Sequence, residues 1–127
     1  MWRYVVGVVL IGHGLANMAG VMAPWTKSAL GFSDRPWIFS RGITLHTTVG
    51  RLFSLVWLLS TIGLVAGGVG LLTGQTWWRT AALIGALASL VAIVPWWRTV
   101  PPGARAAAAV DFILYAFLLS PVSSQIV

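Results

Sequence analysis

Apolar residues fill four long stretches of this chain, and polar residues gather in the connections between them. The stretches cover residues 2–22, 45–72, 77–95 and 105–120. A bilayer has a hydrocarbon core about 30 Å thick and a helix rises about 1.5 Å per residue, so about 20 apolar residues predict one membrane-spanning helix. The pattern therefore predicts an all-α integral membrane protein, a four-helix bundle in a single domain.

The third stretch carries markers of the membrane surface at both ends, where the tetrapeptide Trp-Trp-Arg-Thr stands at residues 77–80 and again at residues 96–99. The two tryptophan pairs are roughly 19 residues apart, so a helix would separate them by about 28 Å. Indole rings favour the headgroup level of a bilayer, and the guanidinium groups of Arg79 and Arg98 can extend into water beside them. We predict a transmembrane helix with a tryptophan pair at each membrane surface.

The connections predict the topology. Residues 73–76 and 100–104 contain glycine or proline and are short turns, whereas residues 24–48 form a long polar connection that contains several aromatic residues. Loops of this length often serve as lids or binding loops. We therefore predict an up-down-up-down bundle in which the long connection between the first two helices caps one mouth.

Small residues recur at helical spacing in three of the stretches, a pattern that lets helix backbones approach closely in lipid. The sets are Gly12, Ala16, Ala19 and Ala23 in the first stretch, Gly63 and Gly67 in the second, and Ala81, Gly85 and Ser89 in the third. We expect these faces to form helix–helix contacts.

Composition excludes several classes of function. Of the 127 residues, 58% are hydrophobic and only 8% are charged, against about 25% charged in soluble domains, so lipid must solvate much of the surface. The formal net charge is +6, but the basic residues lie mostly at the ends of apolar stretches, which favours membrane anchoring over nucleic-acid binding. The absence of cysteine excludes disulfides, thiol catalysis and iron–sulfur clusters.

The basic residues also predict an orientation. Those in or near the first and third connections outnumber Arg3 and Arg79 on the opposite side; they are Lys27, Arg35, Arg41, Arg51, Arg98 and Arg105. The positive-inside rule then places both termini outside the cytoplasm, in a multi-pass protein of the cell inner membrane.

Few ionisable residues fall within or beside the spans, and such residues usually face the bundle interior or a wet cavity because charge in lipid is costly. They are His13, His46, Arg51 and Asp111, with Asn17 as a neutral polar neighbour one turn after His13. We predict that all of them border one cavity beneath the long connection and form the binding site.

Three interpretations of this set stay open. In the first, the residues are polar contacts between helices of a packing or accessory subunit, with Asp111 paired to Arg51 or Arg105. In the second, they floor a pocket for a lipophilic small molecule, which Asp111 with His13 or His46 could also convert as general acid and base. In the third, His13 and His46 ligate a b-type haem. We expect no metal site, and partners limited to lipid, a lipophilic ligand, a second copy or a membrane subunit.

The run Gly12-His13-Gly14-Leu15-Ala16-Asn17, followed by a basic loop and three further spans, resembles small bacterial four-helix membrane proteins of the DoxX-like type. Related sequences often read Gly-His-Gly-x-x-His, and Asn17 stands where the second histidine would fall. That departure disfavours a metal or haem held by two histidines of the first helix. The resemblance implies the four-helix membrane fold, in a group that includes redox-associated accessory proteins.

Overall fold

The computed structural model describes residues 1–27, 32, 36, 42–96 and 103–126, and these residues form helices and turns without a β-strand. The long helices are α1 (Trp2–Ala16), α3 (Thr48–Leu72), α4 (Trp78–Ile93) and α5 (Gly103–Leu119). Short segments extend them: α2 (Met18–Met22) and the 3-10 turn η1 (Ala23–Trp25) follow α1, η3 (Val94–Trp96) follows α4, and η4 (Pro121–Gln125) follows α5. The predicted all-α fold class is confirmed.

Three helical segments are long and apolar enough to cross a membrane, which supports a membrane protein. They are Trp2–Trp25, Thr48–Leu72 and Trp78–Trp96, with 24, 25 and 19 residues. Helix α5 has 17 residues, a length of about 26 Å. These segments match the predicted stretches to within about three residues.

The second stretch begins later than predicted, at Thr48, because the residues before it form a turn. The backbone N–H of Thr44 donates to the Thr47 hydroxyl, and that hydroxyl donates to the Thr44 carbonyl at 2.7 Å. Leu45 is buried inside this turn and its carbonyl lies against Gly50. An apolar residue that is buried in a turn looks like part of the helix in a hydropathy pattern.

The molecule exposes many large apolar residues and buries several polar ones, a pattern that is unusual in a soluble protein. Large aliphatic and aromatic side chains are more than half exposed on every long helix, among them Val8, Leu55, Ile62, Val91, Phe112 and Ile113. The buried polar residues are Asn17, Ser54, Ser60, Thr61, Ser89, Asp111 and Ser123. Exposed apolar area on this scale is stable only against lipid.

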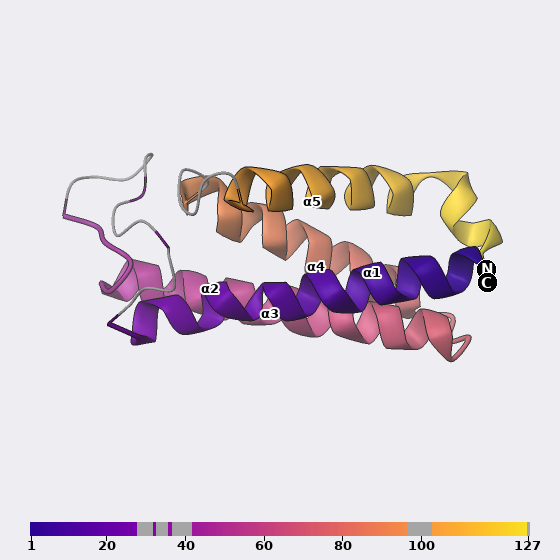
Figure 1. Ribbon diagram of the computed structural model, residues 1–127, viewed down its shortest axis with the longest axis horizontal. Helices are drawn as coiled ribbons and strands as arrows, with labels where there is room; N and C mark the ends of the chain where they lie inside the picture. Colours follow the sequence, from indigo (N-terminus) through magenta and orange to yellow (C-terminus); the bar gives the residue numbers. More distant parts are fainter. Residues whose placement is uncertain (28–31, 33–35, 37–41, 97–102, 127) are drawn as a thin grey trace.

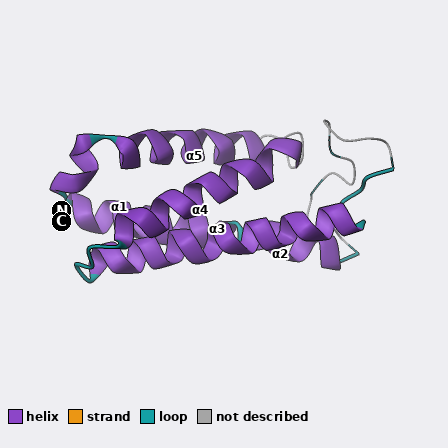
Figure 2. Cartoon of the chain, turned by 180° about the vertical axis from the view of Figure 1, so that it is seen from behind, coloured by secondary structure: helices purple, strands orange, loops and turns teal. Residues whose placement is uncertain are grey.

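The long helices lie side by side, with both termini at one end (Figure 1). Helix α3 packs extensively on α1 and on α4, and α4 in turn packs on α5. Seen from behind, α5 lies along the edge of the bundle with α4 beside it (Figure 2). Among the described residues, α1 packs mainly on α3 and α5 mainly on α4, and α1 and α5 have few contacts with each other.

Glycines bring α3 and α4 into backbone contact, as their spacing predicted. A Cβ atom added to Gly63 would lie 2.7 Å from the Gly85 Cα atom, and one added to Gly67 would lie 2.9 Å from the Ala82 Cα atom. The prediction for the first helix is wrong in its register. A Cβ atom at Gly12 would meet nothing within 4 Å, whereas one at Gly14 would lie 3.0 Å from side-chain atoms of α3.

The tryptophans of α4 are not all at the lipid surface. Trp77 is exposed, but Trp78 and Trp96 are buried among the helices. Arg79 also differs from the prediction that it reaches into water: its Nε donates to the Leu118 carbonyl at 2.6 Å and its Nη2 to the Ser120 carbonyl at 3.5 Å. These carbonyls end α5, where a positive charge is favourable and no helical donor remains.

Replacing Arg79 by glutamine should loosen the end of α5. Glutamine carries no charge and is too short to donate to both the Leu118 and the Ser120 carbonyl. We expect backbone amides of residues 118–123 to exchange hydrogen about tenfold faster, measured by mass spectrometry in detergent. Arg51 lies on another helix, so Arg51→Gln is a matched loss of charge that should leave this exchange unchanged. Equal exchange in the Arg79 variant would show that the contact does not stabilise the helix end.

The long connection that we predicted to cap the bundle lies largely outside the described residues, as do Arg35, Arg41 and Arg98.

Candidate functional site

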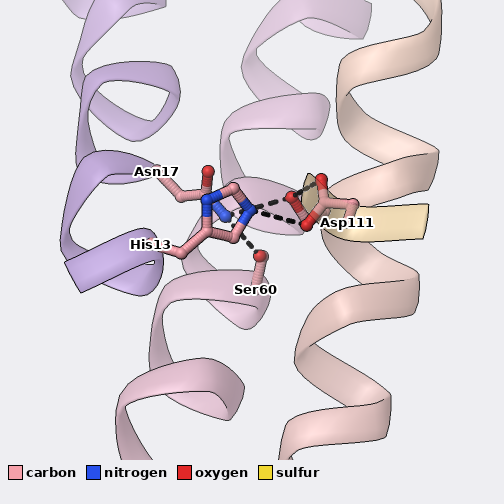
Figure 3. A network of polar contacts seen from close by, with 5 residues as sticks. His13, Asn17, Ser60 and Asp111 are labelled. Carbon is pink, nitrogen blue, oxygen red and sulfur yellow. Dashed lines mark hydrogen bonds and ion pairs between the residues drawn. The ribbon is translucent and has the colours of Figure 1, made fainter. Parts of the chain in front are cut away.

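Four polar contacts join residues from every long helix into one network (Figure 3). Asp111 Oδ1 of α5 lies 2.6 Å from His13 Nε2 of α1, and Asp111 Oδ2 accepts a hydrogen bond of 2.5 Å from the Ser89 hydroxyl of α4. Asn17 Nδ2 donates to Ser89 Oγ at 3.1 Å and to Ser60 Oγ of α3 at 2.7 Å. The order along the network is therefore His13, Asp111, Ser89, Asn17, Ser60.

The network lies deep in the bundle. Ser60, Ser89 and Asp111 are fully buried and Asn17 is 5% exposed. His13 lies near the middle of the 24-residue segment Trp2–Trp25, about 16 Å along the helix from Trp2. A charged group at this depth of a membrane is costly. The network supplies the hydrogen-bond partners that lipid cannot offer to these polar side chains.

A local irregularity places Asn17. Helix α1 ends at Ala16 and α2 begins at Met18, with Asn17 between them at φ −66° and ψ −14°. Its backbone N–H donates to the His13 carbonyl, and its own carbonyl accepts from the Gly20 N–H at 3.0 Å. The chain thus keeps its helical direction through Asn17, and the Asn17 side chain reaches α3 and α4 while His13 reaches α5.

One nitrogen of His13 remains available. Nε2 faces Asp111, whereas Nδ1 hydrogen-bonds to no described residue, and the His13 side chain keeps 10% of its surface exposed. Its neighbours at i−4 and i+3, Val9 and Ala16, lie on the flank turned away from α3 and are both exposed. The site is therefore a buried polar network with one histidine edge near the bundle surface.

His46 and Arg51 do not join this network through any contact between described residues. His46 Nε2 lies 2.9 Å from the Thr26 carbonyl, and the Arg51 guanidinium lies over the Trp25 ring, 4.9 Å from its centroid. The contacts of Asp111 are with His13 and Ser89, so the structure does not form the Asp111–Arg51 pair that the sequence left open. His46 and Arg51 both lie at the end of the bundle where α3 begins.

The geometry is unfavourable for a b-type haem held by His13 and His46. Thr26 follows His13 by 13 residues along a nearly continuous helical path, so His46, bonded to Thr26, lies about 20 Å from His13. One haem iron cannot bind both imidazoles at that separation. Among the described residues no group of three or more possible metal ligands occurs.

A serine nucleophile is equally unsupported. In a hydrolytic triad the histidine lies between the serine and the acid, whereas here Asp111 lies between Ser89 and His13. No histidine contacts the Ser89 hydroxyl, which donates to the Asp111 carboxylate. The arrangement therefore lacks the serine–histidine contact that activates a hydroxyl.

Sequence reasoning found three of the five network residues and missed Ser60 and Ser89. The sequence did contain a signal for Ser89. This serine shares the small-residue face of α4 with Ala81 and Gly85, and that face packs against α3. Small polar residues on such faces commonly hydrogen-bond across helices.

Comparison of the chain with family models, with curated proteins and with solved structures found no match. The site must therefore be interpreted from its own geometry.

Proposed function

We propose that this chain is a four-span membrane protein whose site binds a lipophilic small molecule through the His13–Asp111 pair. In this proposal α5 spans the bilayer with the other three segments in up-down-up-down order. The positions of the basic residues support an orientation with both termini outside the cytoplasm. Of the described residues, Lys27, Arg51 and Arg105 are in or near the first and third connections, and Arg3 and Arg79 belong to the opposite end.

The observation that carries the proposal is the partly exposed His13 edge at mid-span. A fully satisfied packing network would use both imidazole nitrogens, yet Nδ1 has no partner among the described residues. An unused polar group in lipid costs free energy, and a bound polar head group would recover it.

Electroneutrality specifies what that head group must offer. A net charge at mid-membrane is unfavourable, so in this proposal the His13–Asp111 pair is neutral overall, with one proton between the two groups. If the proton is on His13, both ring nitrogens bear hydrogen; if it is on Asp111, that acid donates to Nε2 and the ring hydrogen stays on Nδ1. In both neutral states Nδ1 is a donor. The ligand therefore presents a hydrogen-bond acceptor, such as a carbonyl or ether oxygen, on an apolar body.

The approach to His13 from lipid passes Val9 and Ala16. Both are exposed, and the methyl side chain of Ala16 leaves the imidazole edge uncovered. We expect Ala16→Leu to obstruct this approach without altering any contact of the network, because Ala16 takes no part in it.

The test is native mass spectrometry of the protein purified in mild detergent, with an absorption spectrum of the same sample. We expect a retained lipophilic mass in the wild type, reduced at least about tenfold in His13→Ala, as expected for one lost hydrogen bond to a charged or polarised group. Ala16→Leu should reduce it as well, because the larger side chain obstructs the approach to the imidazole. His46→Ala and Val8→Leu are matched controls that should retain the ligand. Helical content by circular dichroism checks that each variant is folded.

Two outcomes would contradict ligand binding at this site. A wild-type protein that is free of ligand and forms a discrete oligomer would favour an accessory or packing subunit. A ligand that stays bound in both His13→Ala and Ala16→Leu would place its site elsewhere in the chain.

A second function rests on the same 2.6 Å contact between Asp111 and His13. A proton held between two groups can be transferred to a bound carbonyl, so the pair would serve as general acid and base in an isomerisation or hydration. Catalysis differs from binding in one measurable way: Asp111→Asn would abolish turnover of the identified ligand while the His13 Nδ1 donor still retained it.

A further inference from the structure

A groove of about 330 Å³ lies at the start of α3, at the opposite end of the bundle from the termini. It is lined by Trp25, Thr48, Arg51, Leu52 and Leu55. All five residues are exposed, and none belongs to the polar network around Asp111. The groove joins a cation and a hydroxyl to an apolar surface.

The cation of this groove is held in place. The Arg51 guanidinium lies 4.9 Å from the centroid of the Trp25 ring, a favourable cation–π distance. Trp25 Nε1 donates to the Ser54 hydroxyl at 3.1 Å, and that hydroxyl donates to the Arg51 carbonyl at 2.6 Å. Because the ring is anchored one turn from the arginine, the guanidinium is positioned before any ligand arrives.

The charge of Arg51 is not neutralised by a described side chain. The carboxylate of Asp111 is occupied by His13 and Ser89, and Arg51 makes no ion pair with another described residue. A planar guanidinium with free N–H groups is well suited to phosphate oxygens.

The depth of Arg51 matches the phosphate level of a bilayer. Helix α3 has 25 residues and is about 37 Å long, whereas the hydrocarbon core is about 30 Å thick. When α3 is centred in the bilayer, Thr48 therefore lies in the headgroup region and the Arg51 backbone at the edge of the hydrocarbon core, from which the long arginine side chain reaches the phosphates. The adjoining Trp25 has the preference of an indole for that level.

An apolar track continues from the groove toward the membrane centre. Leu52, Leu55, Leu59 and Ile62 share one face of α3, and all four are exposed. From Leu52 to Ile62 the track extends about 15 Å. It offers a surface for an acyl chain directly below the arginine.

We propose that this groove is a specific site for an anionic phospholipid. The phosphate binds the Arg51 guanidinium beside the Thr48 hydroxyl, and one acyl chain lies along the Leu52–Ile62 track. This site is independent of the proposed His13 ligand and serves to fix the protein's height and orientation in an anionic leaflet.

The experiment is a native mass spectrometry titration in detergent with phosphatidylglycerol and with phosphatidylcholine of the same acyl chains. The wild type should bind phosphatidylglycerol about fivefold more tightly, the contribution of one arginine near an anionic headgroup. Arg51→Gln should remove this preference, and Arg51→Lys, which keeps the charge, should retain most of it. Arg105→Gln removes a charge from an exposed residue at the start of α5 and should leave the preference unchanged.

Three results would overturn the proposal. These are a preference that survives in a folded Arg51→Gln protein, an equal loss in Arg105→Gln, and displacement of the lipid by an equal concentration of inorganic phosphate. The second would indicate general charge attraction, and the third an anion site without a role for the acyl chain.

Discussion

Replacing Asp111 by leucine should lower the free energy of unfolding by about 3 kcal/mol. The substitution removes the acceptor of both His13 and Ser89, so two polar groups stay buried without a partner. Neutral hydrogen bonds between membrane helices contribute only about 0.6 kcal/mol on average. A loss several times larger would identify an ionic or proton-sharing contact. Titration with sodium dodecyl sulfate in mixed micelles, followed by circular dichroism, measures it.

Asp111→Asn is the matched control for this experiment. The amide keeps the size of the carboxyl group and one acceptor oxygen, so we expect a loss of about 1 kcal/mol. If the leucine variant were as stable as the asparagine variant, the network would not hold α5 to the bundle. Its polar residues would then be present for ligand contact alone.

Gly85→Ala should be the second most damaging change, with a loss of about 2–3 kcal/mol. Its Cβ atom would lie 2.5 Å from the Leu64 backbone nitrogen and 2.8 Å from the Gly63 carbonyl carbon. Backbone atoms cannot rotate away as a side chain can, so α3 and α4 must separate along their contact. The same detergent titration reports the change.

Gly12→Ala makes the comparison informative, because it adds the same methyl group to another membrane helix. No heavy atom lies within 4 Å of the added Cβ atom, and alanine favours a helix by about 1 kcal/mol over glycine. We expect unchanged or slightly raised stability. A loss at Gly12 as large as at Gly85 would mean that Gly12 packs against a second copy or another subunit.

Bilayer thickness made the helices predictable, since any chain that spans 30 Å of hydrocarbon must present long apolar stretches. The same constraint made His13, Asn17 and Asp111 conspicuous, because polar residues at that depth need partners. The sequence gives their depth along a helix directly. It does not give the rotation of one helix against another, which decides whether two residues at one depth meet.

This distinction accounts for the residues that were placed incorrectly. Gly12 and Gly14 look alike in sequence, yet only Gly14 faces α3, because helix rotation separates them by about 200°. His46 and Arg51 were assigned to the site because they enter from the same side as Asp111. Each instead contacts the segment after α2, at Thr26 and Trp25. Ser60 and Ser89 were missed because serine is common in helices and cheap to expose.

The polar network also has a consequence for synthesis of the chain, since its members are made in a fixed order. His13 precedes Asp111 by 98 residues, and α5 leaves the ribosome after α1, α3 and α4. Asn17 can meet Ser60 once α3 has inserted and Ser89 once α4 has inserted, but His13 meets Asp111 only after α5 has been made. Completion of the bundle thereby depends on α5: until that helix has been made and has packed, the imidazole of His13 lacks its carboxylate partner.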